Sequence, residues 1–148
     1  MFKNMMQNLK DINDMPDEKI NMLNPLVLAY IGDSVYELYI RTSMLADNTE
    51  SNVHKLHILS IKYVKAHAQF ETLHRIQDIL TEEELNIVRR GRNSKSGFVP
   101  KNADVCEYRN ATGFEALLGY MYLKGDIKRL MDILNCSMAE KKSDEGVH

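Results

Sequence analysis

The sequence has few of the features that mark secreted or membrane proteins. It has no tryptophan and only two cysteines, Cys106 and Cys136, which form no CxxC pair and have no histidine at a zinc-ligand interval. We therefore expect both thiols to be reduced and structural. No uninterrupted apolar run approaches the ~20 residues that span a bilayer, and the first residues are too polar for the core of a signal peptide. These absences predict a cytoplasmic protein with no membrane partner.

An excess of charge of one sign is also lacking. The formal net charge is −2, so any binding of nucleic acid must depend on a local basic patch. The apolar share of 44% is ordinary for a globular protein, and 148 residues fit one compact domain. We expect an N-terminal arm at residues 1–15, one domain at residues 16–139 and a disordered polar tail at residues 140–148.

No stretch alternates apolar and polar residues between turns, so no strands are expected and the predicted fold class is all-α. Caps and helical spacing instead predict a bundle of about six to eight helices. The expected segments are a short helix from Pro16 to Leu23, a long helix over 25–46 capped by Asn24, a helix from 51 or 52 to about 73, a helix over 82–92 opened by the capping box of Thr81 and Glu84, a helix from 102–104 to 124, and a last helix from 126 to 139.

An acid interrupts each of the two most apolar helices. Asp33 follows Gly32 in the first, and Glu115 stands close to Gly113 in the second. An ionised carboxylate in such a place is costly unless a cation or hydrogen-bond donors compensate it. If the helices cross at their small residues the two carboxylates meet, and such a pair can share a proton or bind a hard cation such as Mg²⁺. A structural role for each acid alone remains open, and we favour that role for Glu37, one turn after Asp33.

The segment from Arg89 to Lys101 is the most basic part of the chain and contains no acid. Gly91, Gly97 and Pro100 predict a loop here rather than a continuous helix. A charge run is usually only a solvated segment. As a functional alternative, its basic side chains could contact the phosphates of a nucleic acid. Those candidates are Arg89, Arg90, Arg92, Lys95 and Lys101.

Two stretches of the sequence resemble the catalytic motifs of the ribonuclease III family. They are Tyr-Ile-Gly-Asp-Ser-Val at residues 30–35 and Thr-Gly-Phe-Glu-Ala-Leu-Leu-Gly at residues 112–119. The chain also ends about where that nuclease domain ends, and we expect no double-stranded-RNA-binding domain after it. With the segments 89–95 and 108–113, this arrangement is similar to the stand-alone subfamily called Mini-ribonuclease III. The likeness covers about residues 20–138.

The resemblance implies an all-helical homodimer that hydrolyses double-stranded RNA to 5′-phosphate and 3′-hydroxyl ends, with the precursor of 23S ribosomal RNA as its substrate. It implies that Asp33 and Glu115 are the catalytic metal ligands, for Mg²⁺ or for Mn²⁺ in its place. Leu26, Ala29 and Thr112 stand where the longer members of the family have further acids. With fewer charged ligands, we expect weaker metal binding and a shell that holds more water.

Two other functions remain open at this point. One is a non-catalytic RNA-binding or ribosome-associated helical protein on the same fold, and the other is a helical scaffold for protein interactions. The histidines are expected to be packing or surface residues; they are His54, His57, His67 and His74. One apolar group is assigned equally to the core and to a dimer interface; it comprises Tyr36, Tyr39, Ile40, Tyr120, Met121 and Tyr122.

Overall fold

The computed structural model of the chain describes residues 15–94 and 99–145, and every regular element in these ranges is helical. The all-α prediction is confirmed, while residues 1–14 of the arm predicted at residues 1–15 lie outside the described residues. The elements are α2 (Asp17–Asn21), α3 (Pro25–Asp47), α4 (Val53–Val64), α5 (Ala66–Ile76), the short 3₁₀ helix η1 (Gln77–Ile79), α6 (Glu82–Asn93), α7 (Val105–Lys124) and α8 (Ile127–Glu145).

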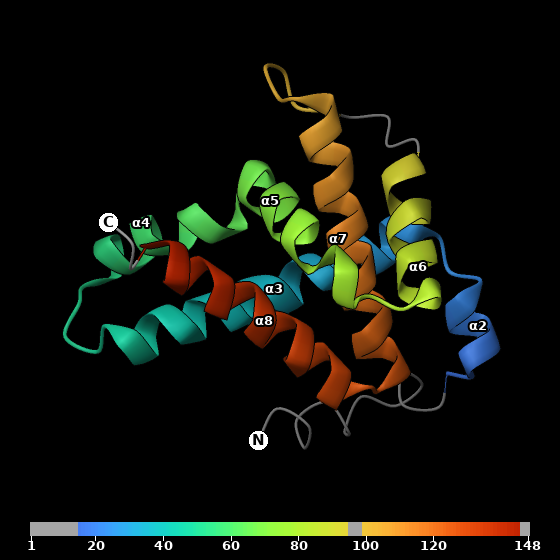
Figure 1. The fold of residues 1–148 in the computed structure, drawn as a ribbon, viewed down its shortest axis with the longest axis horizontal. Helices are drawn as coiled ribbons and strands as arrows, with labels where there is room; N and C mark the ends of the chain where they lie inside the picture. The colour runs from blue at the N-terminus through green and yellow to red at the C-terminus, as the bar shows by residue number, and fades with distance from the viewer. Residues whose placement is uncertain (1–14, 95–98, 146–148) are drawn as a thin grey trace.

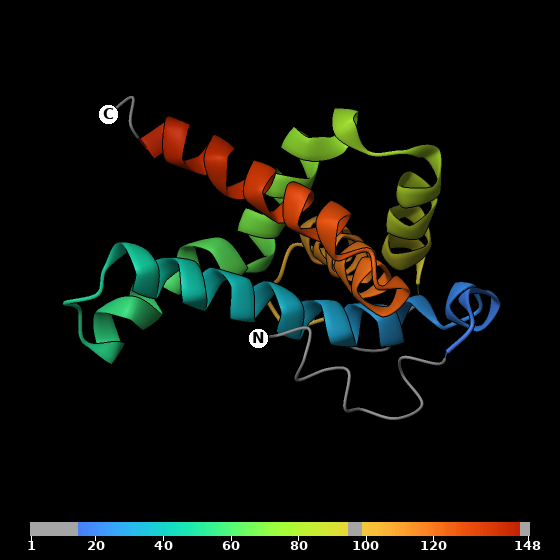
Figure 2. The ribbon, with the colours of Figure 1, turned by 90° about the horizontal axis from the view of Figure 1, so that it is seen from below.

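Helix α7 is the centre of the bundle. It lies between α5 and α6 in Figure 1, and α3 runs beneath it in Figure 2. Nearly every residue of α7 from Ala111 to Met121 is buried, so this helix is apolar on almost all sides. The edge of one aromatic ring meets the face of another between α3 and α7, where the centroids of Tyr36 and Phe114 are 5.2 Å apart.

Two glycines allow α3 and α7 to cross with their backbones in contact. A Cβ atom built on Gly32 would lie 1.7 Å from the main-chain oxygen of Glu115, and one built on Gly119 would lie 1.9 Å from that of Leu28. No side chain could be accommodated at either position without moving a helix, because the neighbouring atoms belong to the backbone. The two apolar helices therefore cross at their small residues.

Several predicted helix starts are confirmed by their hydrogen bonds. The Asn24 side chain accepts from the backbone N–H of Leu26 at 2.9 Å at the start of α3. Thr81 and Glu84 form both halves of the capping box that opens α6. These caps satisfy backbone donors that have no partner inside the helix, and they can be recognised from a few neighbouring residues.

The single helix predicted from residue 51 or 52 to about residue 73 is wrong. The backbone of Lys65 is extended, with ψ at 153°, and it divides the segment into α4 and α5. The first part packs on α3 and the second on α7, so one straight helix could not reach both partners. The segment contains no glycine or proline that would have indicated the break.

The end of α6 agrees with its prediction, whereas the end of α8 does not. Helix α6 ends at Asn93, one residue past its predicted end, so the first residues of the basic segment are helical. Gly91 is a packing residue there, because a Cβ atom on it would lie 2.8 Å from the Cα atom of Gly113. Helix α8 continues to Glu145, so residues 140–145 are helical rather than a disordered tail. No strong helix breaker precedes Gly146, which explains the extension.

The apolar group that was assigned equally to the core and to an interface is largely core. Tyr36, Ile40, Tyr120 and Met121 are buried, while Tyr39 and Tyr122 are partly buried and pack against the same core. The large apolar side chains that remain exposed on α3 are different ones, namely Val27, Tyr30, Leu38 and Leu45. None of the helices in the described ranges combines the length and apolarity needed to cross a membrane.

Replacement of Gly32 by alanine tests the importance of the crossing. We expect Gly32→Ala to lower the free energy of unfolding by about 3 kcal/mol or more, because the added methyl group meets backbone that cannot turn aside. Urea denaturation followed by circular dichroism measures the loss. Ser34→Ala, at an exposed position of the same helix, is the matched control and should change stability by less than about 0.5 kcal/mol. Equal stability of the two variants would contradict the backbone contact.

Candidate active site

The acids singled out from the sequence lie at the crossing of α3 and α7. Gly32 contacts the main chain of Glu115, and Asp33 is the next residue of α3. The two carboxylates are close enough for the charge of Asp33 to raise the pKa of Glu115. Asp33 is exposed and Glu115 is half-buried, so the pair lies where the apolar core meets solvent.

The environment makes ionisation of Glu115 costly. Burial is the largest cause, followed by the charge of Asp33, and together with Glu37 they raise the pKa of Glu115 to about 8 despite hydrogen bonding from the Gln69 side chain. Burial and the charge of Glu37 also raise the pKa of Asp33. The charges of three carboxylates therefore repel one another beside the crossing of α3 and α7. A bound cation would relieve that repulsion.

Glu37 has a partner of its own. Its carboxylate forms an ion pair with Arg41 at 3.3 Å, one helical turn further along α3; the Arg41 side chain is largely exposed and that of Glu37 is partly buried. This pairing agrees with the structural role favoured for Glu37. Its charge nevertheless acts on both Asp33 and Glu115, so Glu37 contributes to the potential of the site.

A divalent cation would find two carboxylates here rather than a complete cage of protein ligands. Among the described residues no group of three or more His, Cys, Asp or Glu side chains is arranged to hold a metal ion. Mg²⁺ commonly binds through one or two carboxylates and keeps several waters or phosphate oxygens. Asp33 and Glu115 fit that mode of binding, and their mutual repulsion without a cation is what such an ion would offset.

Gln69 is a residue of the site that sequence reasoning missed. It lies on α5, is only 2% exposed, and faces Glu115, whose pKa it lowers by hydrogen bonding. Its spacing to Leu73 and Ile76 could have indicated that Gln69 faces the core, since residues four and seven positions apart share one face of a helix. A polar residue on such a core-facing stripe needs a buried partner.

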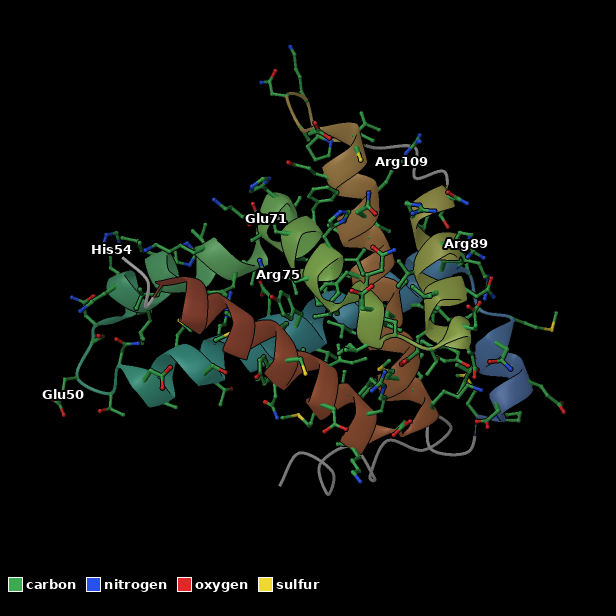
Figure 3. The ribbon with its side chains drawn as sticks, viewed as in Figure 1. Glu50, His54, Glu71, Arg75, Arg89 and Arg109 are labelled. Carbon is green, nitrogen blue, oxygen red and sulfur yellow. The ribbon has the colours of Figure 1, made fainter. Side chains whose placement is uncertain are left out.

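The five basic residues singled out from the sequence do not form one set. Arg89 and Arg92 are exposed and three residues apart on α6, and Lys101 is exposed before α7. Arg90 donates to the main-chain oxygens of Asn21 and Leu23, both at 3.2 Å, and thereby ties α6 to the end of α2. Lys95 lies outside the described residues. Figure 3 shows Arg89 on α6 and Arg109 near the start of α7.

The histidines agree with their expected surface role. All four considered from the sequence are exposed. His67 links α5 to α7, because its Nδ1 atom lies 2.5 Å from Glu107; its Nε2 atom lies 2.8 Å from Glu71, one turn along α5. Hydrogen bonding to Glu107 raises the pKa of His67.

Comparison with known proteins shows to which family the chain is similar. Residues 26–126 match the model of the Ribonuclease III domain. The chain is 53% identical to Mini-ribonuclease 3 of a Thermoanaerobacter species, covering 93% of this chain and 96% of that protein. It is 48% identical to Mini-ribonuclease 3 of Clostridium tetani, covering 87% of both chains. A crystal structure of a Fusobacterium nucleatum protein matches with a TM-score of 0.73 and 31% identity, covering 82% of this chain and 97% of that one.

These matches span the crossing and both acidic motifs. The chain belongs to the ribonuclease III family, whose members are endoribonucleases that generally depend on a metal ion. Within that family it belongs with the Mini-ribonuclease III proteins. The resemblance first noted in two short motifs therefore extends over most of the chain.

The raised pKa of Glu115 predicts how stability depends on pH in metal-free protein. The folded state binds a proton between the ordinary value of 4.5 and about 8, so stability should decrease through this window as pH rises. The slope is up to roughly 1.4 kcal/mol per pH unit. Glu115→Gln should therefore match the wild type near pH 5 and exceed its stability at pH 8.

Urea denaturation in the presence of a chelator, at a series of pH values, measures this difference. Glu50→Gln, in the exposed turn after α3, is the matched control and should follow the wild type throughout. A constant difference between Glu115→Gln and the wild type across the pH range would contradict a buried, repelled carboxylate.

Proposed function

We propose that this endoribonuclease cleaves double-stranded RNA, depends on Mg²⁺, and leaves 5′-phosphate and 3′-hydroxyl ends. The observation that carries the proposal is the meeting of Asp33 and Glu115 at the glycine crossing, with burial and mutual charge opposing the ionisation of Glu115. Each acid belongs to one of the two stretches that resemble the catalytic motifs of the family. The precursor of ribosomal RNA is the proposed natural substrate, and a cytoplasmic location remains a prediction from the sequence.

In this mechanism Asp33 and Glu115 hold the divalent cation at the edge of the core. When bound, Mg²⁺ supplies Lewis-acid chemistry, lowering the pKa of water and neutralising the scissile phosphate. The half-buried position of Glu115 keeps one side of the site dry, while the exposed position of Asp33 leaves the other side open to RNA. Leu26, Ala29 and Thr112 contribute no charge, so water and phosphate oxygens would complete the shell.

Basic side chains near the ends of α6 and α7 would contact the RNA backbone. Arg89, Arg92 and Lys101 are exposed and can pair with phosphates, whose recognition is independent of sequence. Lys95 belongs to the same proposal on the basis of sequence alone. Arg90 is the weakest of the five candidates, because its guanidinium group already donates to two main-chain oxygens of the segment that joins α2 to α3.

Removal of either acid tests the catalytic assignment. Asp33→Asn and Glu115→Gln should each lower kcat by at least about 100-fold, since loss of a charged ligand should cost no less than loss of an outer hydrogen-bond partner, which is roughly 10–100-fold. Binding of duplex RNA without Mg²⁺ should be unchanged. A gel assay of duplex cleavage and a filter-binding assay give the two readouts.

The control for this pair is Asp132→Asn, an exposed carboxylate on α8 that should retain wild-type cleavage. Full activity in Asp33→Asn or Glu115→Gln would refute the assignment. Wild-type protein that binds duplex RNA but does not cleave it at any concentration of Mg²⁺ or Mn²⁺ would instead favour the non-catalytic RNA-binding function.

A homodimer is also part of the proposal, because cleavage of both strands of a duplex needs two sites, which a two-fold axis provides. An exposed apolar stripe on α3 supports it. Val27, Tyr30, Leu38 and Leu45 are between 47% and 76% exposed and follow one another at roughly helical spacing. Ser34 and Arg41 lie between them on this face, and exposed apolar side chains gathered on one helix face are typical of an interaction site. Because Asp33 lies on the same helix, pairing through α3 would bring two sites into one assembly.

Charge placed on this stripe tests the dimer. The double variant Tyr30→Lys, Leu38→Lys should be monomeric, because desolvating two lysines opposes association, whereas the wild type should have the mass of a dimer. Light scattering after size-exclusion chromatography measures both. Met131→Lys, at a 39% exposed apolar position of α8, is the matched control and should stay dimeric. A monomeric wild type would refute the proposed assembly.

A further inference from the structure

Gln69 stands out because a glutamine side chain is rarely buried to this degree. It is 2% exposed and lies on the face of α5 that packs against α7. Its Nε2 atom donates to the main-chain oxygen of Val64 at 2.8 Å. Its Oε1 atom has no hydrogen-bond partner among the described residues. A buried amide with an unused acceptor calls for an explanation beyond packing.

The break between α4 and α5 makes the contact to Val64 available. In a continuous helix the oxygen of Val64 would accept from the backbone N–H of Ala68, four residues on. Because the extended backbone of Lys65 ends α4 at Val64, that oxygen accepts from the Gln69 side chain instead. The side chain is thereby anchored at one end to the backbone of the break.

The other partner of Gln69 is Glu115. A primary amide has two N–H donors, and with one committed to Val64 the second is free for a carboxylate. The Gln69 side chain is a hydrogen-bond partner of the Glu115 carboxylate across the packing of α5 on α7. Gln69 therefore joins the backbone at the α4–α5 break to a carboxylate on α7.

We propose that Gln69 is a positioning residue, which holds the Glu115 carboxylate in the orientation that binds the divalent cation. This role rests on the proposed function, in which Glu115 is a metal ligand. Outer hydrogen-bond partners restrict the orientation of a ligand and increase its readiness to bind metal. The unpartnered Oε1 of Gln69 can in addition accept a hydrogen bond from a water beside the carboxylate.

The experiment compares Gln69→Met with the wild type. Methionine keeps the length and unbranched shape of glutamine but has no donor. We expect its dissociation constant for Mn²⁺, measured without RNA by electron paramagnetic resonance of the free ion, to rise by about 10-fold or more. The Mg²⁺ concentration for half-maximal cleavage should rise with it, while kcat at saturating Mg²⁺ should change by less than about 3-fold, since the reacting groups are retained.

Thr72→Val is the matched control, because Thr72 is fully buried one turn further along the same helix and accepts from Arg75. It should affect stability without weakening Mn²⁺ binding. Gln69→Asn is a second variant that keeps the amide but is one methylene shorter, so it should not span Val64 and Glu115 at once and should weaken Mn²⁺ binding as Gln69→Met does.

Three results would overturn the proposal. Wild-type affinity for Mn²⁺ in both Gln69 variants would show that the residue does not position the ligand. An equal loss of affinity in Thr72→Val would reduce the role of Gln69 to packing. A wild-type protein that neither binds Mn²⁺ nor cleaves duplex RNA would overturn the proposed function together with this inference, which distinguishes that failure from the first two.

Discussion

The backbone contact between α3 and α7 is the constraint on which the rest of the structure depends. Gly32 and Gly119 remove the side chains that would separate the two helices, and Asp33 then stands beside Glu115. The same helices bring Tyr36 edge-on to Phe114 in the core. Helices α5 and α6 pack against α7 on either side (Figure 1), so they lie where they can supply groups to this crossing.

The crossing creates an electrostatic problem that a packing role alone would not require. Burial and neighbouring carboxylates oppose the ionisation of Glu115, and only part of that cost is offset by Gln69. Glu37 differs from the other two acids because it is paired with Arg41. A structure that keeps acids in this arrangement is expected where a cation is bound in function, since perturbed carboxylates cluster at such sites.

Features that depend on a few neighbouring residues could be predicted from the sequence. The caps formed by Asn24 and Thr81 are examples, because each involves a side chain and a backbone N–H within three positions. The pairing of Asp33 with Glu115 was also predictable in outline, since each acid is conspicuous in an apolar helix next to small residues. Their distance and burial depend on how the helices cross, which no local pattern contains.

The features that were missed all depend on contacts distant in sequence. Gly91 carries no local sign of its packing role inside α6, where the backbone of Gly113 lies against it. The break at Lys65 has no local signal, and it exists because α4 and α5 pack on different helices. Arg90 was grouped with its basic neighbours, although the backbone after α2 accepts its hydrogen bonds.

The sequence by itself thus determined the helical class, most helix boundaries and the two acids that meet at the crossing, because caps, periodicity and an acid in an apolar helix are properties of short segments. The tertiary structure alone decided which groups surround Glu115. Gln69 donates to the Val64 oxygen that the break at Lys65 makes available, and the two helices on either side of that break pack on α3 and on α7. Such contacts are set by the whole core rather than by any one segment.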